Sequence, residues 1–185
     1  MRIISGEARG RKLFAPAGED TRPTVDRIRE SVFNILSARV WDAEVLDLFG
    51  GTGAMALEAL SRGAEHAVIV DSGREAIRAI ERNSQSVLKD AAPERVKILR
   101  ADYRAAIDAM RDVRFDLVFL DPPYRMADAY ADALTRLRAH GLLREDCICL
   151  LERAADAQIS LPDGFERYDT RTYGGTSVEF VREAR

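Results

Sequence analysis

The chain has 185 residues, of which 46% are hydrophobic and 32% are charged, and its formal net charge at pH 7 is −3. That length and composition suit a single domain with a full hydrophobic core. No apolar run approaches the ~18 residues of a membrane-spanning helix, and "MRIISGEARGRKL" lacks the apolar region of a signal peptide, so we expect neither a membrane protein nor a secreted one.

The N-terminal segment carries a charge opposite to that of the rest of the chain. Residues 1–29 hold seven basic and four acidic side chains, a net charge of +3, whereas the rest holds 21 and 27, a net charge of −6. A locally basic segment can bind a polyanion even on an acidic protein, although a solvated tail would have the same composition. The basic residues are Arg2, Arg9, Arg11, Lys12, Arg22, Arg27 and Arg29.

Residues 1–23 are predicted to form a short strand and loops. A helix is expected to follow, with Thr24 as its N-cap. Its apolar residues recur at the spacing i, i+3, i+7, which predicts one buried stripe. The stripe consists of Val25, Ile28, Val32, Phe33, Ile35 and Leu36.

Strands and helices then alternate along the chain. The predicted strands are 44–48, 66–71, 95–99, 115–121 and 147–152, and the predicted helices are 54–62, 74–89, about 103–111 and about 127–139. This alternation predicts a parallel, doubly wound α/β sheet. The last segment, "FERYDTRTY", "GG" and "TSVEFV", instead predicts a β-hairpin that adds an antiparallel edge.

The two cysteines, Cys147 and Cys149, belong to the fifth predicted strand and are separated by a single residue. A disulfide between such positions is sterically awkward, and two ligands do not complete a metal site. Both are expected to be buried small side chains in a reducing compartment.

The stretch "DLFGGTGAMALEA" (47–59) joins the end of a strand, a glycine turn and the start of a helix. Gly51 and Gly53 permit positive φ and a close approach of a ligand to the backbone. The second strand ends at Asp71, at the separation from the glycines where a carboxylate can bind both hydroxyls of a ribose. These residues indicate a nucleotide-like cofactor, although a turn without a ligand could have the same glycines.

The residues of this turn leave the identity of the cofactor open, because "GTGAMA" also fits the G-x-G-x-x-A pattern of a nicotinamide dinucleotide site. Asp47 precedes the turn, and its carboxylate would repel a pyrophosphate but attract an ammonium group. Asp102 follows the third strand, where it could accept from an adenine amino group or act as the N-cap of the next helix.

The fourth predicted strand runs into "LDPPY" (120–124). A residue before proline favours extended backbone and proline fixes its own φ, so Asp121 and Pro122 are expected to form a rigid loop. The Asp121 carboxylate and a main-chain carbonyl would be two acceptors, which suit the two donors of an exocyclic amino group. Tyr124 could stack on the face of a base. We interpret the loop as a clamp for an amino-bearing planar ring; the simpler alternative is a strand terminator.

Together these motifs resemble those of the RsmD family, S-adenosylmethionine-dependent methyltransferases that modify the exocyclic N2 of a guanine in bacterial 16S rRNA. The matching stretches are "RIISGEARGRKL", "RPTVDRIRESVFNIL", "DLFGGTGAMALEALSRGA", "DPPY" and "YGGTSVEF", which span Arg2 to about Phe180. "DPPY" alone is shared with DNA and protein-glutamine methyltransferases, whereas the second stretch is far more specific. Gly50 stands where the family usually has Ala, and Ala56 where it often has Gly.

The resemblance implies a class I methyltransferase (Rossmann-like) fold, with a seven-stranded, mostly parallel sheet and a C-terminal antiparallel hairpin in residues 24–185. Residues 1–23 would be a basic N-terminal extension that contacts RNA. The implied cofactor residues are Asp47, Gly51 and Gly53 for the methionine part, Asp71 for the ribose and Asp102 for the adenine. Asp121 and Pro122 would bind the guanine amino group, with Tyr124 on the base. The implied RNA contacts are Arg9, Arg11, Lys12, Arg22, Arg27 and Arg29, although the last two could form an ordinary solvated helix face.

The expected reaction is in-line methyl transfer from a sulfonium to guanine N2, which needs no metal because the cofactor loses its positive charge as it reacts. Asp121, with an ordinary pKa near ~4, would receive the amino proton after methylation or pass it to water. The expected partner is 16S rRNA or an assembly intermediate of the small ribosomal subunit. The protein itself is expected to be a cytoplasmic monomer.

Three alternatives remain at this stage. The same chemistry could act on DNA adenine or protein glutamine, although 185 residues leave no room for a DNA-recognition domain. An NAD(P)-dependent reductase could use "GTGAMA", but no acid or base suited to hydride transfer is evident. A catalytically silent RNA-binding factor could keep the fold, but the intact "DPPY" argues against it.

Overall fold

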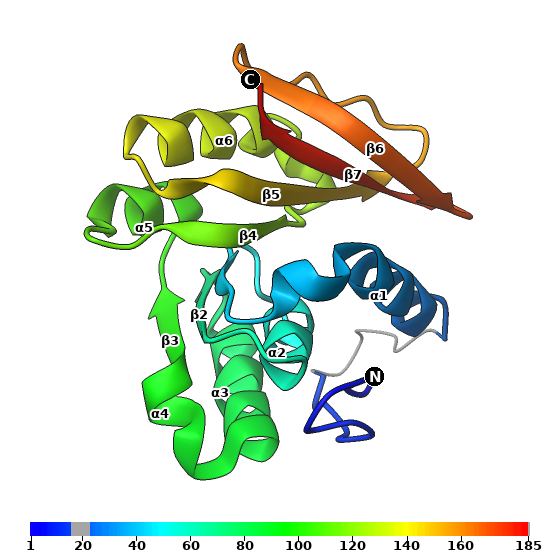
Figure 1. Cartoon of the computed structure of the whole chain (residues 1–185), viewed down its shortest axis with the longest axis vertical. Coiled ribbons are helices and arrows are strands. Elements are labelled where there is room, and N and C mark those ends of the chain that lie inside the picture. The colour runs from blue at the N-terminus through cyan, green and yellow to red at the C-terminus, as the bar shows by residue number, and fades with distance from the viewer. Residues whose placement is uncertain (16–22, 185) are drawn as a thin grey trace.

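A seven-stranded sheet forms the centre of the protein, and helices cover both of its faces (Figure 1). This computed structural model describes residues 1–15 and 23–184, and only the backbone of residues 23–25 and of Tyr124. The strand order is β3-β2-β1-β4-β5-β7-β6. The strands are β1 (Glu44–Asp47), β2 (His66–Asp71), β3 (Val96–Arg100), β4 (Phe115–Leu120), β5 (Leu143–Ala154), β6 (Phe165–Tyr173) and β7 (Thr176–Glu183).

The first five strands are parallel, and β7 lies antiparallel between β5 and β6. The predicted doubly wound sheet with a C-terminal antiparallel hairpin is therefore confirmed. From β1 the chain proceeds outward through β2 to β3, and then returns to the other side of β1 with β4. The β1–β4 boundary is thus the point where the strand order reverses, which is where open α/β sheets bind their ligands.

The helices follow the predicted segments closely. They are α1 (Pro23–Leu36), α2 (Ala54–Ser61), α3 (Arg74–Leu88), α4 (Ala92–Arg95), α5 (Tyr103–Ala109) and α6 (Ala129–Ala139), with 3-10 turns η1 (Ser37–Val40), η2 (Lys89–Ala91) and η3 (Tyr124–Met126). The sequence did not predict α4 or the 3-10 turns, which are too short to show a periodic pattern. Helix α1 begins at Pro23, so that Thr24, the expected N-cap, lies inside its first turn. No helix among the described residues is long and apolar enough to span a bilayer.

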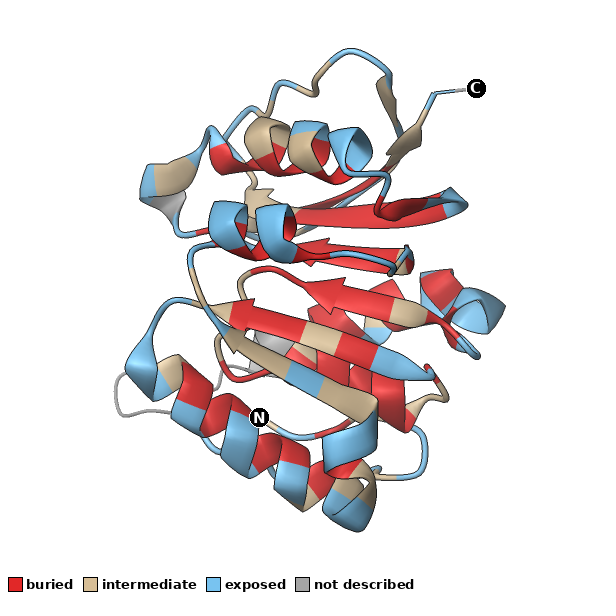
Figure 2. Ribbon diagram, turned by 90° about the vertical axis from the view of Figure 1, so that its left-hand side faces the viewer, coloured by how far each residue is buried: buried red, intermediate tan, exposed pale blue. Residues whose placement is uncertain are grey.

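Two apolar layers hold these elements together, and the central strands are buried between them (Figure 2). Residues of α1, α2 and α3 pack on one face of the sheet, and residues of α5 and α6 pack on the other. The predicted α1 stripe is largely confirmed, because Ile28, Val32, Phe33 and Leu36 are buried; Ile35 was wrongly included and is 38% exposed. The side chain of Val25 is outside the described part. Cys147 and Cys149 are buried free thiols, as expected.

The N-terminal segment (residues 1–15) packs on the domain instead of extending from it. Ile3 and Leu13 belong to the core beneath α1 and α2, and an isolated bridge pairs Arg2 with Lys12. Gly6 has a φ of +83°, and a Cβ there would lie 1.7 Å from the main-chain oxygen of Ser61 at the end of α2. The close approach of two backbones therefore requires glycine at this position.

A buried carboxylate anchors this segment. Both oxygens of Glu58 accept main-chain N–H bonds, from Ile4 at 2.8 Å and from Ser5 at 3.0 Å. The same carboxylate lies 2.7 Å from Arg62 Nε and 3.6 Å from Arg29 Nε. Glu58 is 0% exposed and Arg29 is 2% exposed. The segment is thus joined to α1 and α2 by a buried charged network.

Candidate active site

Four carboxylates lie at the carboxyl edge of the sheet, on the face that α1 and α2 cover. Strand pairing places Ile69, Asp47, Phe119 and Leu150 in one row across β2, β1, β4 and β5. Alternate side chains along a strand point to the same face. Asp71, Asp121 and Glu152 therefore follow in the next row, beside Asp47. The register brings together Asp47, Asp71 and Asp121, which the sequence had suggested separately.

The glycine turn between β1 and α2 is tied to the end of β2. Gly51 (φ 55°) donates from its N–H to Asp71 Oδ2 at 2.9 Å, and Gly73 donates to Asp71 Oδ1 at 2.7 Å. Gly53 (φ 78°) is the N-cap of α2. Each oxygen of Asp71 keeps a second lone pair for a ligand. Gly50 fits the turn because a Cβ would lie 2.4 Å from Ile69 Cγ2.

Asp47 is almost fully enclosed, with 4% of the residue exposed. Burial raises the pKa of its carboxyl to about 7, and the negative charges of Asp121 and Asp71 contribute in the same direction. Hydrogen bonds from the backbone of Phe49 and Ala56 oppose this rise. A desolvated carboxylate with two anionic neighbours favours a ligand that carries positive charge.

Asp121 follows β4 directly, and Pro122 beside it is buried. Although Asp121 is exposed as a whole residue, the protein around its carboxylate partly desolvates it and raises its pKa to about 6. The ordinary pKa near ~4 expected from the sequence was therefore wrong, because it took no account of this crowding. Tyr124 lies in η3, but its side chain is outside the described part, so its stacking role stays a prediction.

Glu152 completes the row, and the sequence did not identify it as a site residue. It follows Leu151 of β5, which pairs with Leu120 of β4, and so lies beside Asp121 just after β4; its side chain is half-buried. Burial and the charge of Asp121 raise the pKa of Glu152 to about 7. Its main-chain oxygen accepts a hydrogen bond from Tyr130 Oη of α6 at 2.5 Å. The only sequence signal was an acidic residue at the end of an apolar strand, "CICLLE".

Asp102 acts as the N-cap of α5, because its Oδ1 accepts from the main-chain N–H of Arg104 at 2.9 Å. The alternative interpretation of this residue is thus confirmed. Its carboxylate is 52% exposed, and Oδ2 lies 3.9 Å from Arg104 Nη1. Contact of the second oxygen with an adenine remains a prediction.

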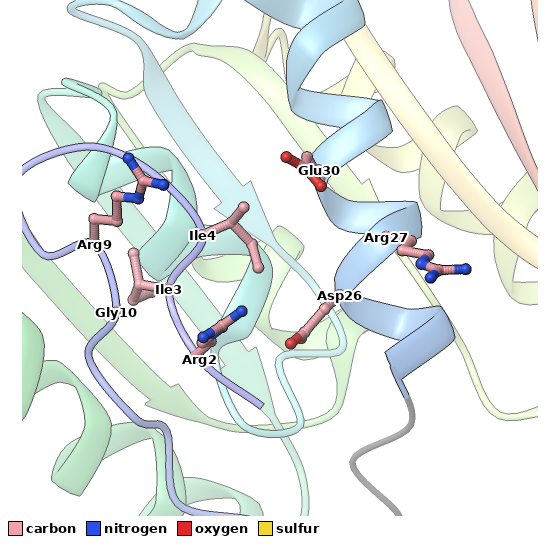
Figure 3. A pocket seen from close by; sticks show the side chains of 8 residues that line it. All are labelled: Arg2, Ile3, Ile4, Arg9, Gly10, Asp26, Arg27 and Glu30. Carbon is pink, nitrogen blue, oxygen red and sulfur yellow. The ribbon is translucent and has the colours of Figure 1, made fainter.

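A cavity of about 410 Å³ lies between the N-terminal segment and α1 (Figure 3). Arg2 and Arg9 approach it from the N-terminal segment, Asp26 and Glu30 approach it from α1, and Arg27 points away along the other side of the helix. A neighbouring cavity of about 560 Å³ contains Arg9, Arg11 and Lys12 among its lining residues. Three of the described basic residues that were predicted to contact RNA are thus gathered here, namely Arg9, Arg11 and Lys12. Arg27 lines the first cavity, but its side chain turns away from Arg2 and Arg9, and Arg29 lines neither cavity.

Arg29 was predicted to contact RNA, and that prediction is wrong. Its guanidinium is enclosed by Glu58, by Asp26 at 3.0 Å and by the main-chain oxygen of Arg2. With 2% of its surface exposed it cannot reach a polyanion, so its charge serves the buried network instead. Arg22 lies outside the described residues.

Arg9, Arg11 and Lys12 form a basic surface. This basic surface adjoins the carboxylate edge through the glycine turn. Thr52 of the turn donates from Oγ1 to Met1 Sδ at 3.4 Å. Asn83 of α3 donates to the main-chain oxygen of Thr52 at 2.9 Å and accepts from the N–H of Phe14 at 2.7 Å. One end of the N-terminal segment therefore contacts the loop beside the carboxylates directly, through Met1, and the other end is joined to it through Asn83.

Comparison with known proteins assigns the chain to a family over almost its whole length. The family model "Conserved hypothetical protein 95" matches residues 1–182. The chain is 36% identical over 188 residues to "Putative rRNA methyltransferase YlbH" of Bacillus subtilis, covering 99% of both chains. It is 35% identical over 189 residues to "Ribosomal RNA small subunit methyltransferase D" of Escherichia coli, covering 100% of this chain and 91% of that protein. The solved structure "Putative methyltransferase yhhF from Escherichia coli" has a TM-score of 0.85 at 28% identity, covering 100% of this chain and 99% of the other.

Proposed function

The chain belongs to the RsmD family, whose model is described as conserved hypothetical protein 95, and from that premise we propose that it transfers a methyl group from S-adenosylmethionine to the exocyclic N2 of a guanine in 16S rRNA. The observation that carries the proposal is the position of Asp121, which lies in the carboxylate row beside the glycine turn. The substrate would be rRNA, naked or in an assembling small subunit, in the cytoplasm.

The carboxylate edge suits this cofactor because S-adenosylmethionine has a net positive charge: its sulfonium and ammonium groups outnumber its single carboxylate. Asp47 would accept from the ammonium group, and Gly51 and Gly53 would leave room for the methionine part. Asp71 would use its remaining lone pairs for the ribose hydroxyls, and Asp102 would accept from the adenine amino group. The net positive charge of the ligand would offset the repulsion among the carboxylates of the row.

Asp121 would position the amino group for attack. Its carboxylate and a main-chain carbonyl of the loop would accept both N–H bonds, so that the nitrogen lone pair points toward the methyl carbon. S-adenosylmethionine would supply the methyl group, and Asp121 would accept the amino proton after methylation and pass it to water. With a pKa of about 6 the carboxylate is mostly ionised at pH 7.5 yet more basic than an ordinary aspartate. Most of the catalytic effect would come from holding the two reactants in line.

Cofactor affinity should depend on pH through Asp47. The pKa of this carboxyl is about 7 in the free protein, so below pH 7 a proton must leave before the ammonium can bind. We expect the affinity for S-adenosylmethionine to fall by up to about tenfold for each pH unit below 7. Above pH ~8 the affinity should fall again as the α-amino group of the cofactor loses its proton.

Calorimetric titrations between pH 5.5 and 9 would measure this profile. Asp47→Asn should bind S-adenosylmethionine weakly, and its affinity should no longer fall below pH 7. Asp90→Asn, which changes an exposed residue after α3, should keep the wild-type profile. A wild-type affinity that is constant from pH 5.5 to 7.5 would show that Asp47 does not hold the ammonium group.

The basic surface should determine RNA affinity and its dependence on salt. Replacing Arg9, Arg11 and Lys12 by Gln should lower affinity for small-subunit RNA and reduce the slope of log K against log salt by up to ~2–3, because fewer counterions are released. A control with the same change of charge replaces three exposed arginines near the amino edge of the sheet, Arg111, Arg114 and Arg144. If both triple variants flatten the slope equally, RNA binding depends on net charge alone.

Nucleoside mass spectrometry of small-subunit RNA tests the proposed reaction directly. RNA from cells that lack the gene should lose one N2-methylguanine, and the purified protein with S-adenosylmethionine should restore it. Methylation of adenine in DNA or of a glutamine side chain by the same preparation would replace this proposal with the corresponding alternative.

A further inference from the structure

Glu152 occupies the place in the carboxylate row that the proposed cofactor contacts leave unused. Counting across the sheet, Asp71 and Asp47 are assigned to the cofactor and Asp121 to the amino group that is methylated. Glu152 follows on the next strand, on the side of Asp121 away from the glycine turn. A group bound there would belong to the substrate base.

We propose that Glu152 accepts a hydrogen bond from N1–H of the target guanine and thereby selects guanine over bases that lack this donor. The inference rests on the proposed guanine-N2 function and adds a specificity-determining residue to it. Guanine offers N1–H and the N2 amino group side by side on one edge. Adjacent strands lie about 4.8 Å apart, so carboxylates on neighbouring strand ends can reach neighbouring donors of one ring.

The contacts of Glu152 differ from those of the other enclosed glutamates. Glu58 has two arginines and two main-chain donors, and Glu179 lies 2.6 Å from Arg153 Nε and 2.5 Å from Arg167 Nε. Within residues 1–15 and 23–184, no side-chain hydrogen bond or ion pair of Glu152 is found. Glu58 and Glu179 thus stabilise the fold, whereas the carboxylate of Glu152 remains available to a ligand.

The backbone holds this carboxylate in place. The hydrogen bond from Tyr130 Oη fixes the main-chain oxygen of Glu152, and pairing with Val178 of β7 holds its other side. A carboxylate on a paired strand is positioned more accurately than one on a loop. Its raised pKa agrees with the assignment, because a donor from the base would favour the ionised form and offset the repulsion from Asp121.

RNA that carries 2-aminopurine at the methylated position provides the test. This base keeps the 2-amino group but has a lone pair at N1 where guanine has N1–H. Small-subunit RNA would be prepared by ligation with either base, and kcat/KM for methyl transfer would be measured with wild-type protein and Glu152→Gln. Glutamine has the same shape, and its NH₂ group can donate to the N1 lone pair.

At pH 8.5, where Glu152 with its pKa of about 7 is ionised, wild-type protein should prefer guanine by about 30-fold, because the carboxylate would otherwise face a lone pair and must first take up a proton to donate to it. Glu152→Gln should lower the rate on guanine at least ~10-fold and reduce the preference to below ~10-fold. Comparing the two ratios removes effects of the base that do not involve Glu152, including the missing O6. Glu145→Gln, an exposed residue near the other end of β5, should leave both values unchanged.

The inference is overturned if wild-type protein at pH 8.5 methylates both RNAs within ~5-fold of each other, or if Glu152→Gln keeps the wild-type preference at that pH. The first measurement needs no variant, so a folding defect cannot obscure it. Loss of the proposed function would look different, because no N2-methylguanine would then disappear from the RNA of cells lacking the gene. Unchanged cofactor affinity in Glu152→Gln would further separate base recognition from cofactor binding.

Discussion

Replacing Asp121 by asparagine should lower methyl transfer to small-subunit RNA at least ~100-fold, and the loss should be in kcat. Asparagine keeps the shape and one acceptor oxygen, but its NH₂ would face the N–H donors of the substrate. A donor opposite a donor in a closed site costs about 1–3 kcal/mol, and loss of the negative charge beside the reacting nitrogen adds to that. Removing a charge from a crowded group of acids should leave folding intact.

Single-turnover methyl transfer measures this effect without interference from product release. Asp128→Asn is the matched control, because Asp128 is exposed just before α6 and its replacement makes the same change of charge outside the carboxylate row. The control should retain nearly wild-type activity. A near-native rate for Asp121→Asn would mean that the "DPPY" loop only ends the strand and that the proposed chemistry is wrong.

Replacing Glu58 by glutamine should destabilise the domain by about 3–5 kcal/mol, because buried Arg29 and half-buried Arg62 lose the carboxylate that they share. Arg29 would keep Asp26 alone, and Arg62 would lose its 2.7 Å partner. The amide NH₂ would also face the main-chain N–H groups of Ile4 or Ser5. Release of the N-terminal segment should therefore accompany the loss of stability.

Comparing the urea unfolding of Glu58→Gln with that of Glu75→Gln would separate the effect of losing a buried carboxylate from the effect of losing a negative charge. Glu75 pairs with Arg78 on the surface of α3, and both side chains are more than half exposed. Such a pair contributes about 0–1 kcal/mol. Equal unfolding free energies for the two variants would show that the Glu58 network does not stabilise the fold.

Local sequence patterns were sufficient to predict most elements of this fold. An apolar run bounded by Glu65 and Asp71 defined β2 to the residue, and the hairpin followed from a "GG" turn between two runs of strand-forming residues. The start of β5 was missed, because "LRED" is mostly polar and resembles a loop. Its strand character depends on pairing with Phe115 of β4, which is distant in the sequence.

The site was predictable where a local motif marked it and not where distant residues created it. Glycines at fixed spacing indicated the cofactor turn, and prolines after a strand indicated Asp121. Arg29 could not be distinguished from a solvated arginine, because its partner Glu58 belongs to another helix that is distant in the sequence. Glu152 was missed for a similar reason: its neighbour Asp121 is assigned by strand order, which a single sequence does not give. The raised pKa values likewise depend on packing, which removes the acids from water and, to a smaller extent, brings them close to one another.

The position of β7 has a consequence for how the protein is synthesised. This strand is made after β5 and β6, yet it is inserted between them, and Val178, Phe180 and Val181 complete both apolar layers. A nascent chain that has reached β6 therefore exposes the unpaired edge of β5 and cannot yet close its core. The sheet can therefore close only after β7 has left the ribosome, and until then the exposed edge of β5 is a site at which the partly folded chain can aggregate.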